Sequence, residues 1–300
     1  MVVVFGTVCL DRTRRVARLP RPGQYVEVES ECIRVGGEAA NTAIALRRWG
    51  AEPVLAGNSI GGAESQRFFK AKGLELPTAP ETDSETPVCD IYVTPEGERT
   101  MFGYRFRGLS ELAPPVPKVG PGDWLTTDAN LGVASEKALA LARESGAGTY
   151  ALDSDIGGGL TAMVWQSSTD LVGHRGDIQR NLELMEGWVR EFEGLAILSD
   201  AANGFIAGGR LPGGGLLAPR HFAPFPCPHV VDSTGAGDVF RAGMLLGLDA
   251  EWPLSDSLRF ASAAGCLNCT REGASEDVPS QDDVFAHIAA SPGVARSYEL

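Results

Sequence analysis

The stretch Val230–Leu248, VVDSTGAGDVFRAGMLLGL, decides the fold of this chain. Its first residues are apolar and β-branched, which predicts a strand, and its second half carries apolar residues at helical spacing, which predicts a helix. Between the two lie the small residues Gly235–Gly237, followed at once by Asp238. A strand that passes through glycines into a helix is typical of α/β proteins, in which ligands bind where the strands end.

This stretch also predicts a chemistry. Glycines leave the backbone N–H groups uncovered at the start of a helix, where the helix dipole attracts an anion such as a phosphate. Asp238 falls in the first helical turn and is therefore placed to accept a proton from a hydroxyl. An anion hole beside a carboxylate base is what phosphoryl transfer to an alcohol requires. The alternative, a turn whose acids only cap the helix, is weakened because Asp232 and Ser233 already supply caps.

Length and composition limit the other possibilities. The chain has 300 residues, enough for one large domain, and a formal net charge of -13, which argues against nucleic-acid binding. We see no basic region followed by a long apolar stretch, and no apolar run approaches the roughly 20 residues of a membrane span. We therefore expect no signal peptide, no membrane partner and a cytoplasmic location. The six cysteines are scattered, and Cys266 and Cys269 predict ordinary packing more than a metal or redox site.

The middle of the chain alternates between strands and helices. Strands are predicted at 124–128, 149–153, 169–173 and 195–199, with helices within 135–144 and 177–192. This alternation predicts a mostly parallel sheet covered on both faces. Residues 12–35 and 87–106 do not fit the alternation, and we expect them to form a small β lid beside a single domain that spans residues 1–300.

Several motifs resemble one family. Asp232–Gly243, DSTGAGDVFRAG, resembles the C-terminal signature of the ribokinase-like (phosphofructokinase-B type) carbohydrate and nucleoside kinases. Phe5–Asp11, FGTVCLD, resembles the family's first strand, which ends in a substrate-binding aspartate. Val35–Ala51 resembles its Gly-Gly-x-x-x-Asn helix, and Arg259–Pro279 its final nucleotide-side helix. The resemblance implies a ribokinase-like three-layer sandwich with a mainly parallel central sheet and a small β lid.

The same resemblance implies an ATP- and Mg²⁺-dependent kinase that phosphorylates a hydroxyl of a small sugar, sugar acid or nucleoside. It also makes a homodimer through the lid plausible. Two purely structural alternatives stay open: Gly37 only allows the backbone to enter the helix, and Asn41 is an ordinary buried polar residue. The implied roles are Asp238 as base; Gly235, Ala236 and Gly237 as anion hole; Asp11, Gly37, Asn41, Asn130 and Arg105 for the substrate; Ser199, Gly204, Arg175, Ser262 and Gly237 for ATP; Asp177 for Mg²⁺; and Asp232, Thr234, Asn268, Arg271, Gly273 and Asp277 for K⁺.

The nucleotide half departs from the family pattern. After the strand predicted at 169–173, Arg175 and Ile178 stand where the family carries Asn and Glu, and Asp177 is the nearest substitute. In the next phosphate loop, Ser199 and Ala201 replace the usual Thr and Gly. A catalytically inactive, ligand-binding or regulatory protein on the same fold therefore remains the alternative. A nicotinamide dehydrogenase is excluded, because no G-x-G-x-x-G follows the first strand.

The acceptor is the least defined part of the prediction. The pair Tyr104–Arg105 loosely resembles 2-keto-3-deoxygluconate kinases, and an arginine fork matches a carboxylate or a phosphate. The alternative for Arg105 is a solvated strand face. Glu38 stands where ribokinases often have Lys, and Cys9 where they often have Asn, which puts ribose itself in doubt. The sequence leaves a sugar, a sugar acid and a nucleoside open.

Overall fold

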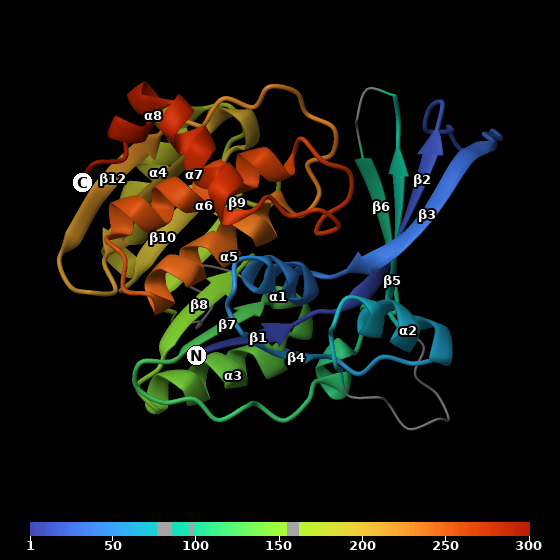
Figure 1. The fold of residues 1–300 in the computed structure, drawn as a ribbon, viewed down its shortest axis with the longest axis horizontal. Coiled ribbons are helices and arrows are strands. Elements are labelled where there is room, and N and C mark those ends of the chain that lie inside the picture. The colour runs from blue at the N-terminus through green and yellow to red at the C-terminus, as the bar shows by residue number, and fades with distance from the viewer. Residues whose placement is uncertain (77–85, 96–98, 155–161) are drawn as a thin grey trace.

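The computed structural model describes residues 1–76, 86–95, 99–154 and 162–300. Its main body is built on a sheet of 8 strands (Figure 1). The strands are β1 (Val2–Gly6), β4 (Val54–Gly57), β7 (Trp124–Asp128), β8 (Gly148–Leu152), β9 (Val164–Ser168), β10 (Leu195–Ser199), β11 (Phe205–Arg210) and β12 (Leu216–Phe222).

The order of the strands is β12-β11-β10-β9-β8-β7-β1-β4. All neighbours from β10 to β4 pair in parallel, and only β11 and β12 at one edge pair antiparallel. The central strands are buried on both faces, as apolar parallel strands require. The predicted mainly parallel sheet is therefore confirmed.

Helices cover both faces of this sheet and make the outer two layers of the sandwich. One face packs a core that includes Phe240 and Phe260, and the other packs a core that includes Trp165 and Met185. The first layer holds α1 (Glu38–Arg48), α5 (Ala236–Asp249), α6 (Leu254–Asn268), α7 (Gln281–Ala290) and α8 (Pro292–Arg296). The second layer holds α3 (Val133–Glu144) and α4 (Ile178–Glu191). The shorter elements are α2 (Ala63–Ala71), η1 (Leu109–Leu112), η2 (Ala129–Leu131) and η3 (Ala201–Asn203).

A second sheet of 4 strands stands beside the body, at the right of Figure 1. Its order is β3-β2-β5-β6, with β2 and β3 antiparallel, β5 and β6 antiparallel, and β2 parallel to β5. These segments are the ones that the sequence assigns to a lid, and their role as a lid stays a prediction. The strands are β2 (Cys9–Val16), β3 (Val28–Gly36), β5 (Val88–Val93) and β6 (Arg99–Tyr104).

The predicted strand at the start of Val230–Leu248 is wrong. Val230 and Val231 are exposed, and this segment belongs to neither sheet. The backbone N–H groups of Val231 and Asp232 donate to the Cys269 carbonyl at the end of α6, at 2.8 and 3.2 Å. Three prolines between β12 and this segment explain the difference, because proline cannot donate to a strand ladder.

Two further strand predictions are corrected. The strand expected at 169–173 lies five residues earlier, in β9, and Leu171 and Val172 form a turn whose N–H groups bond the Ser168 carbonyl at 3.0 Å. Asp11 does not end the first strand, because β1 ends at Gly6 and Asp11 lies in β2 of the second sheet. In both cases the sequence predicts a strand nearby, but the predicted boundaries of that strand are wrong.

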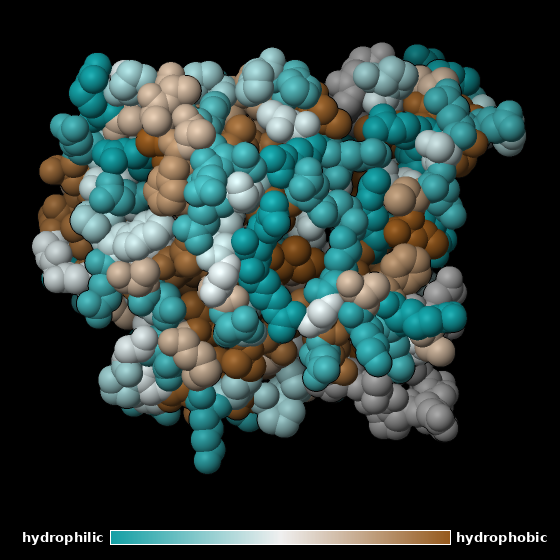
Figure 2. Space-filling view, viewed as in Figure 1, coloured by the Kyte–Doolittle hydropathy of each residue, from teal (hydrophilic) through white to brown (hydrophobic). Residues whose placement is uncertain are grey.

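The face of the molecule in Figure 2 is largely hydrophilic, with small hydrophobic groups, one of them on the second sheet at the right. In the described part of the chain, no helix combines the length and the apolar character that a membrane crossing needs. The six cysteines are free thiols.

Candidate active site

The centre of the site is Asp238, in the first turn of α5. Its carboxylate is 7% exposed. The Nδ2 atom of Asn41, on α1, donates to Asp238 Oδ2 at 2.9 Å. The Nη2 atom of Arg241 lies 3.5 Å from Asp238 Oδ1. The structure thus brings together two residues predicted for the site, Asp238 and Asn41, and adds Arg241 to them.

Burial raises the pKa of Asp238 from 3.8 to about 7, against the opposing effects of Arg241 and the bond from Asn41. A buried carboxyl is costly to ionise, because its charge loses contact with water. A proton affinity near neutral pH suits a carboxylate that removes a proton from a hydroxyl. The structure therefore places at the start of α5 a buried carboxyl whose pKa lies near neutral pH.

Arg241 holds the two helices of the site together. Its side chain is fully buried. Its Nε atom donates to Thr42 Oγ1 at 2.9 Å, and its Nη2 atom donates to the Glu38 carbonyl at 2.6 Å. Arg241 is not among the residues predicted for the site, although its position three residues after Asp238 places both on one face of a helix.

The turn before Asp238 is fixed from two sides. Gly235 has a φ of 74°, and a Cβ atom there would lie 2.7 Å from Ala274. Gln166, in the middle of β9, donates from Nε2 to the Gly237 carbonyl at 3.1 Å and accepts from the Tyr150 hydroxyl at 2.6 Å. The Ala236 N–H makes only a long bond of 3.4 Å, to the Ser233 carbonyl. Contacts on two sides therefore hold the turn at the start of α5, where the Ala236 N–H makes a long hydrogen bond.

The two glycines before α1 are needed for close contacts. A Cβ atom on Gly36 would lie 2.2 Å from the Asp11 carboxyl, and one on Gly37 would lie 2.4 Å from the Thr7 carbonyl. Gly37 also has a φ of 92°. Burial raises the pKa of Asp11 to about 6, which the S–H group of Cys9, 3.3 Å away, partly offsets. Asp11 therefore lies against the Gly-Gly turn, and its role in substrate binding stays a prediction.

Glu38 and Asn130 form a pair on the same side. Asn130, in η2, donates from Nδ2 to Glu38 Oε1 at 3.1 Å. Burial raises the pKa of Glu38 well above its usual range, and Asp128 and Asp238 raise it further. Asp128 itself accepts from the Thr7 N–H and Oγ1, both at 2.7 Å. The structure therefore connects Asn130 to the start of α1, where Asn41 lies.

Four of the residues predicted to hold K⁺ lie together. Asp232 Oδ1 accepts from the Thr234 N–H at 2.9 Å, and Asp232 Oδ2 accepts from the Gly273 N–H at 3.1 Å. Asn268 Nδ2 donates to the Thr234 carbonyl at 3.4 Å. Asp277 points away from this loop: its side chain is 71% exposed and pairs with Arg271 at 3.3 Å.

The second sheet is tied to this loop by arginines. Arg99 of β6 donates from Nη1 to Thr234 Oγ1 at 2.8 Å, immediately before the glycines of the anion hole. Arg34 and Arg15 pair with Glu272 at 3.5 and 3.4 Å. No local pattern predicts these bonds, because they join segments more than a hundred residues apart.

The predicted phosphate loop after β10 has positive φ angles at two residues, Ala201 and Gly204. Ala201, where the family carries Gly, has a φ of 47°, a conformation that glycine prefers. Gly204 has a φ of 87°, and a Cβ atom there would lie 2.1 Å from the Phe222 carbonyl. Asp200 accepts from Thr169 Oγ1 at 2.7 Å and from the Gly176 N–H at 2.9 Å, which joins the two nucleotide-side loops.

The other residues predicted for ATP, Mg²⁺ and the substrate contact neighbouring residues of the fold. Asp177 caps α4, where its side chain accepts from the Arg180 N–H at 3.1 Å. Ser262 bonds the Tyr298 hydroxyl at 2.8 Å. Three more have these placements: Ser199 donates to the Ser167 carbonyl at 3.2 Å, Arg175 is exposed and pairs with Asp170 at 3.2 Å, and the Arg105 guanidinium lies 5.5 Å from the centre of the Tyr104 ring.

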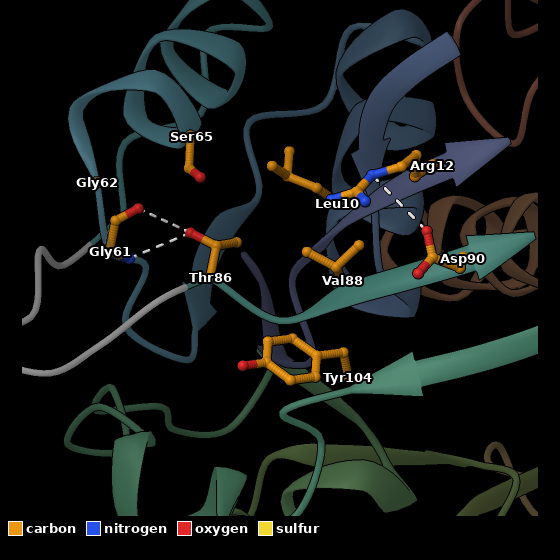
Figure 3. Close-up of a pocket in the computed structure, with 9 residues that line it drawn as sticks. All are labelled: Leu10, Arg12, Gly61, Gly62, Ser65, Thr86, Val88, Asp90 and Tyr104. Carbon is orange, nitrogen blue, oxygen red and sulfur yellow. Dashed lines mark hydrogen bonds and ion pairs between the residues drawn. The ribbon is translucent and has the colours of Figure 1, made fainter. Parts of the chain in front are cut away.

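A pocket of about 440 Å³ lies between the second sheet and the start of α2 (Figure 3). Leu10, Arg12 and Tyr104 point into it from the sheet. Asp11 alternates with Leu10 and Arg12 along β2, so its side chain projects to the other face. This pocket is therefore separate from the site around Asp238.

Solved structures share this architecture. A ribokinase of Cryptococcus neoformans var. grubii, solved in complex with ADP, matches with a TM-score of 0.76 at 21% identity, over 95% of this chain and 98% of that one. This likeness defines the fold as ribokinase-like. The model of the pfkB family carbohydrate kinases matches residues 1–146 and 177–281. The chain belongs to this family, and it is an ATP-dependent kinase with an alcohol group as acceptor.

Two relatives cover most of the chain. One is an uncharacterized sugar kinase of Dictyostelium discoideum, 30% identical in an alignment 340 positions long that covers 94% of this chain and 96% of the relative. The other is an acarbose 7(IV)-phosphotransferase of an Actinoplanes species, 28% identical in an alignment 292 positions long that covers 90% of this chain and 92% of the relative.

Proposed function

We propose that the chain transfers the terminal phosphate of ATP to a hydroxyl of a small sugar, sugar acid or nucleoside, with Asp238 as the base. One observation carries the proposal: a buried carboxylate at the start of α5, bonded to Asn41 at 2.9 Å, with a pKa of about 7. The acceptor hydroxyl would replace Asn41 at Asp238 Oδ2 and lose its proton there. The oxygen would then attack the phosphorus, and ADP would leave.

The neighbouring residues divide the remaining work. Asp11 and Asn41 offer acceptor and donor groups that suit vicinal hydroxyls. The Gly235–Gly237 amides at the start of α5 would stabilise the charge that develops on the phosphoryl group. The second sheet, held by Arg99, would close over the acceptor as a lid and exclude water as a competing acceptor.

The nucleotide side fits ATP through its backbone. The loop of Ser199, Ala201 and Gly204 has positive φ angles at Ala201 and Gly204, and a turn of this kind can direct backbone N–H groups toward a phosphate. No three acidic, His or Cys side chains gather around a metal position in the described ranges, and Asp177 is occupied as a helix cap. Mg²⁺ would therefore arrive on the phosphates of ATP and supply charge neutralisation there.

Two finer assignments belong to this proposal. Asp232 and the carbonyl groups around it would hold K⁺, since oxygen ligands suit a hard cation. Two copies of the chain would pair through the second sheet, where Phe102 and Tyr104 are 58% and 54% exposed. The first is tested by replacing K⁺ with tetramethylammonium, and the second by the mass of the protein in solution.

The decisive test is ADP release from ATP in the presence of Mg²⁺, K⁺ and a panel of sugars, sugar acids, sugar phosphates and nucleosides. The proposal predicts ADP release that depends on one acceptor and that Asp238→Asn abolishes. The alternative, an inactive ligand-binding protein on this fold, predicts that a ligand raises the melting temperature while neither protein releases ADP.

A further inference from the structure

The second sheet carries two opposite charges that face each other without contact. Asp11 on β2 and Arg34 on β3 are paired in register, so their side chains lie on one face of the sheet. The Cβ atoms of such a pair are about 5 Å apart, and opposite charges at these positions attract each other. Burial raises the pKa of Asp11, and Arg34 is close enough to oppose this rise. Among the described residues, however, no ion pair joins the two side chains, because Arg34 pairs with Glu272.

Two glycines make room for this separation. A Cβ atom on Gly36 would lie 2.2 Å from the Asp11 carboxyl. A Cβ atom on Gly273 would lie 3.1 Å from Arg34 Cδ and 3.3 Å from its Nε. Asp11 is thus turned toward the Gly-Gly turn before α1, and Arg34 lies over the loop after α6. A side chain at either glycine would displace the charged group beside it, so the backbone itself keeps the two charges apart.

One donor of Arg34 remains unused. Its Nη2 atom lies 3.5 Å from Glu272 Oε1, and its side chain is 16% exposed. Its Nη1 atom is buried and, in the part of the chain that the structure describes, has no hydrogen-bond partner. A buried donor without a partner is costly, so native proteins usually satisfy it with a ligand or water. Nη1 is therefore the atom of Arg34 that is left for a bound molecule.

The loop under Arg34 is connected to Asp238. Ser275, two residues after Gly273, donates from its hydroxyl to Asn41 Oδ1 at 2.9 Å. Asn41 in turn donates from Nδ2 to Asp238 Oδ2 at 2.9 Å. Arg34 therefore borders, from the second sheet, the same site that Asn41 and Asp238 border from the main body.

We infer that Arg34 is a further acceptor-binding residue: its Nη1 atom donates to one oxygen of the acceptor, while Asp11 accepts from the neighbouring hydroxyl. The acceptor lies between the two charges and under the second sheet, where a buried donor can be reached. It must carry two neighbouring oxygens, one of them with a proton, as a vicinal diol does, or a hydroxyl beside a carboxylate or phosphate. This inference rests on the proposed function and deepens it, because a lone hydroxyl does not meet the requirement.

The test does not require the acceptor to be identified. A small-molecule extract of bacterial cells is passed over a strong anion exchanger, which separates a flow-through of neutral and cationic compounds from an eluate of anionic ones. Each fraction is titrated at saturating ATP, and the transfer of labelled phosphate gives the half-saturating amount of that fraction. Binding is measured separately, as the thermal shift that each fraction causes in Asp238→Asn with and without Arg34→Met.

Arg34→Met should raise the half-saturating amount of the active fraction at least about tenfold, because a hydrogen bond from a charged donor is lost. The half-saturating concentration of ATP should not change. Glu272→Gln is the matched control, since it removes the ion pair of Arg34 but leaves Nη1 in place, and its effect should be much smaller. Arg15→Met, which removes the other partner of Glu272, should resemble Glu272→Gln. If Arg34→Met does not fold, Arg34→Gln takes its place.

Equal effects of Arg34→Met and Glu272→Gln overturn the inference and leave the kinase intact, because Arg34 then only holds the loop. An effect of Arg34→Met on half-saturation by ATP alone does the same. The expected effect supports the inference with either fraction. With the flow-through it identifies the second oxygen as a hydroxyl, and with the eluate as part of a carboxylate or phosphate.

The thermal shift separates this inference from the proposed function. A shift of Asp238→Asn that Arg34→Met abolishes, without transfer in either fraction, supports the inference and overturns the proposed function. Without transfer, a shift that Arg34→Met leaves unchanged, or no shift at all, contradicts both.

Discussion

Asn41 and Asp238 are hydrogen-bonded across 197 residues of sequence, with 2.9 Å between Asn41 Nδ2 and Asp238 Oδ2. This bond joins α1, which we propose to bind the acceptor, to α5, where we propose the anion hole. Ser275 extends it, since its hydroxyl donates to Asn41 Oδ1 at 2.9 Å. Both functional groups of the Asn41 amide are therefore oriented before any acceptor arrives.

The raised pKa of Asp238 predicts opposite effects of pH on activity and on stability. The base must be ionised, so kcat/KM should fall about tenfold for each pH unit below about 7. Because the folded pKa exceeds the ordinary value of 3.8, the contribution of Asp238 to the free energy of unfolding declines as pH rises from 3.8 to about 7.

Asp238→Asn removes this penalty. Its melting temperature should exceed that of the wild type above pH 7, and the gain should shrink as pH falls toward 3.8. Thermal unfolding across this range checks the sign. A gain that is constant with pH would mean that Asp238 does not titrate in this range.

Gly235→Ala should impair both folding and transfer. The φ of 74° alone disfavours alanine, and the added Cβ atom would lie 2.7 Å from Ala274. Gly62→Ala is the matched control, because Gly62 has the same φ of 74° and open space at its Cβ position. We expect about 1 kcal/mol of destabilisation for Gly62→Ala. We expect a larger loss, with loss of activity, for Gly235→Ala. Equal losses in the two variants would show that the contact with Ala274 is unimportant.

Ala201→Gly should stabilise the chain by up to about 1 kcal/mol, because it relieves a left-handed alanine. Ala201 has a φ of 47°, and Ala202, its neighbour in η3, does not share this conformation. Ala202→Gly should therefore destabilise the same loop by about 0.5–1 kcal/mol. Urea unfolding of both variants is the measurement. If Ala201→Gly is as harmful as Ala202→Gly, the loop does not require a left-handed residue at that position.

Arg99→Met should weaken catalysis. Arg99 binds Thr234 Oγ1 at 2.8 Å and thereby holds the second sheet against the turn before the anion hole. Loss of a charged hydrogen bond costs about 1.5–3 kcal/mol, so kcat/KM should fall about tenfold or more. Arg18→Met is the control, since Arg18 bonds Gln24 near the far end of the same sheet. Steady-state rates that are equal for the two variants would contradict a role for this contact in catalysis.

The sequence predicted the parts of the site that a local motif contains. Asp238, its glycines and Asn41 each lie in a short pattern whose chemistry can be read directly, and the structure brings Asn41 to Asp238. The same motif contains the signal for Arg241, because Arg241 follows Asp238 by three residues on a helix and so lies on the same face. The mainly parallel sheet followed from the alternation of strands and helices.

Other features depend on contacts between distant segments and had no local signal. Gln166 supports Gly237 only because β9 lies in the middle of the sheet, below the start of α5. The strand predicted at 169–173 illustrates the same limit, since an apolar turn and a buried strand look alike in a short window. The comparison of Arg175 and Asp177 with the Asn and Glu of the family motif therefore starts from a strand end that is misplaced by five residues.

The most direct test of Asp238 as the base is a comparison of binding with transfer in Asp238→Asn. Calorimetry would give the affinity of this variant for ATP and for the acceptor, and rapid quenching would give its rate of phosphate transfer. We predict affinities close to those of the wild type and a transfer rate lower by roughly 10²–10⁴-fold. A variant that binds both substrates and transfers phosphate at the wild-type rate would contradict the assignment of Asp238.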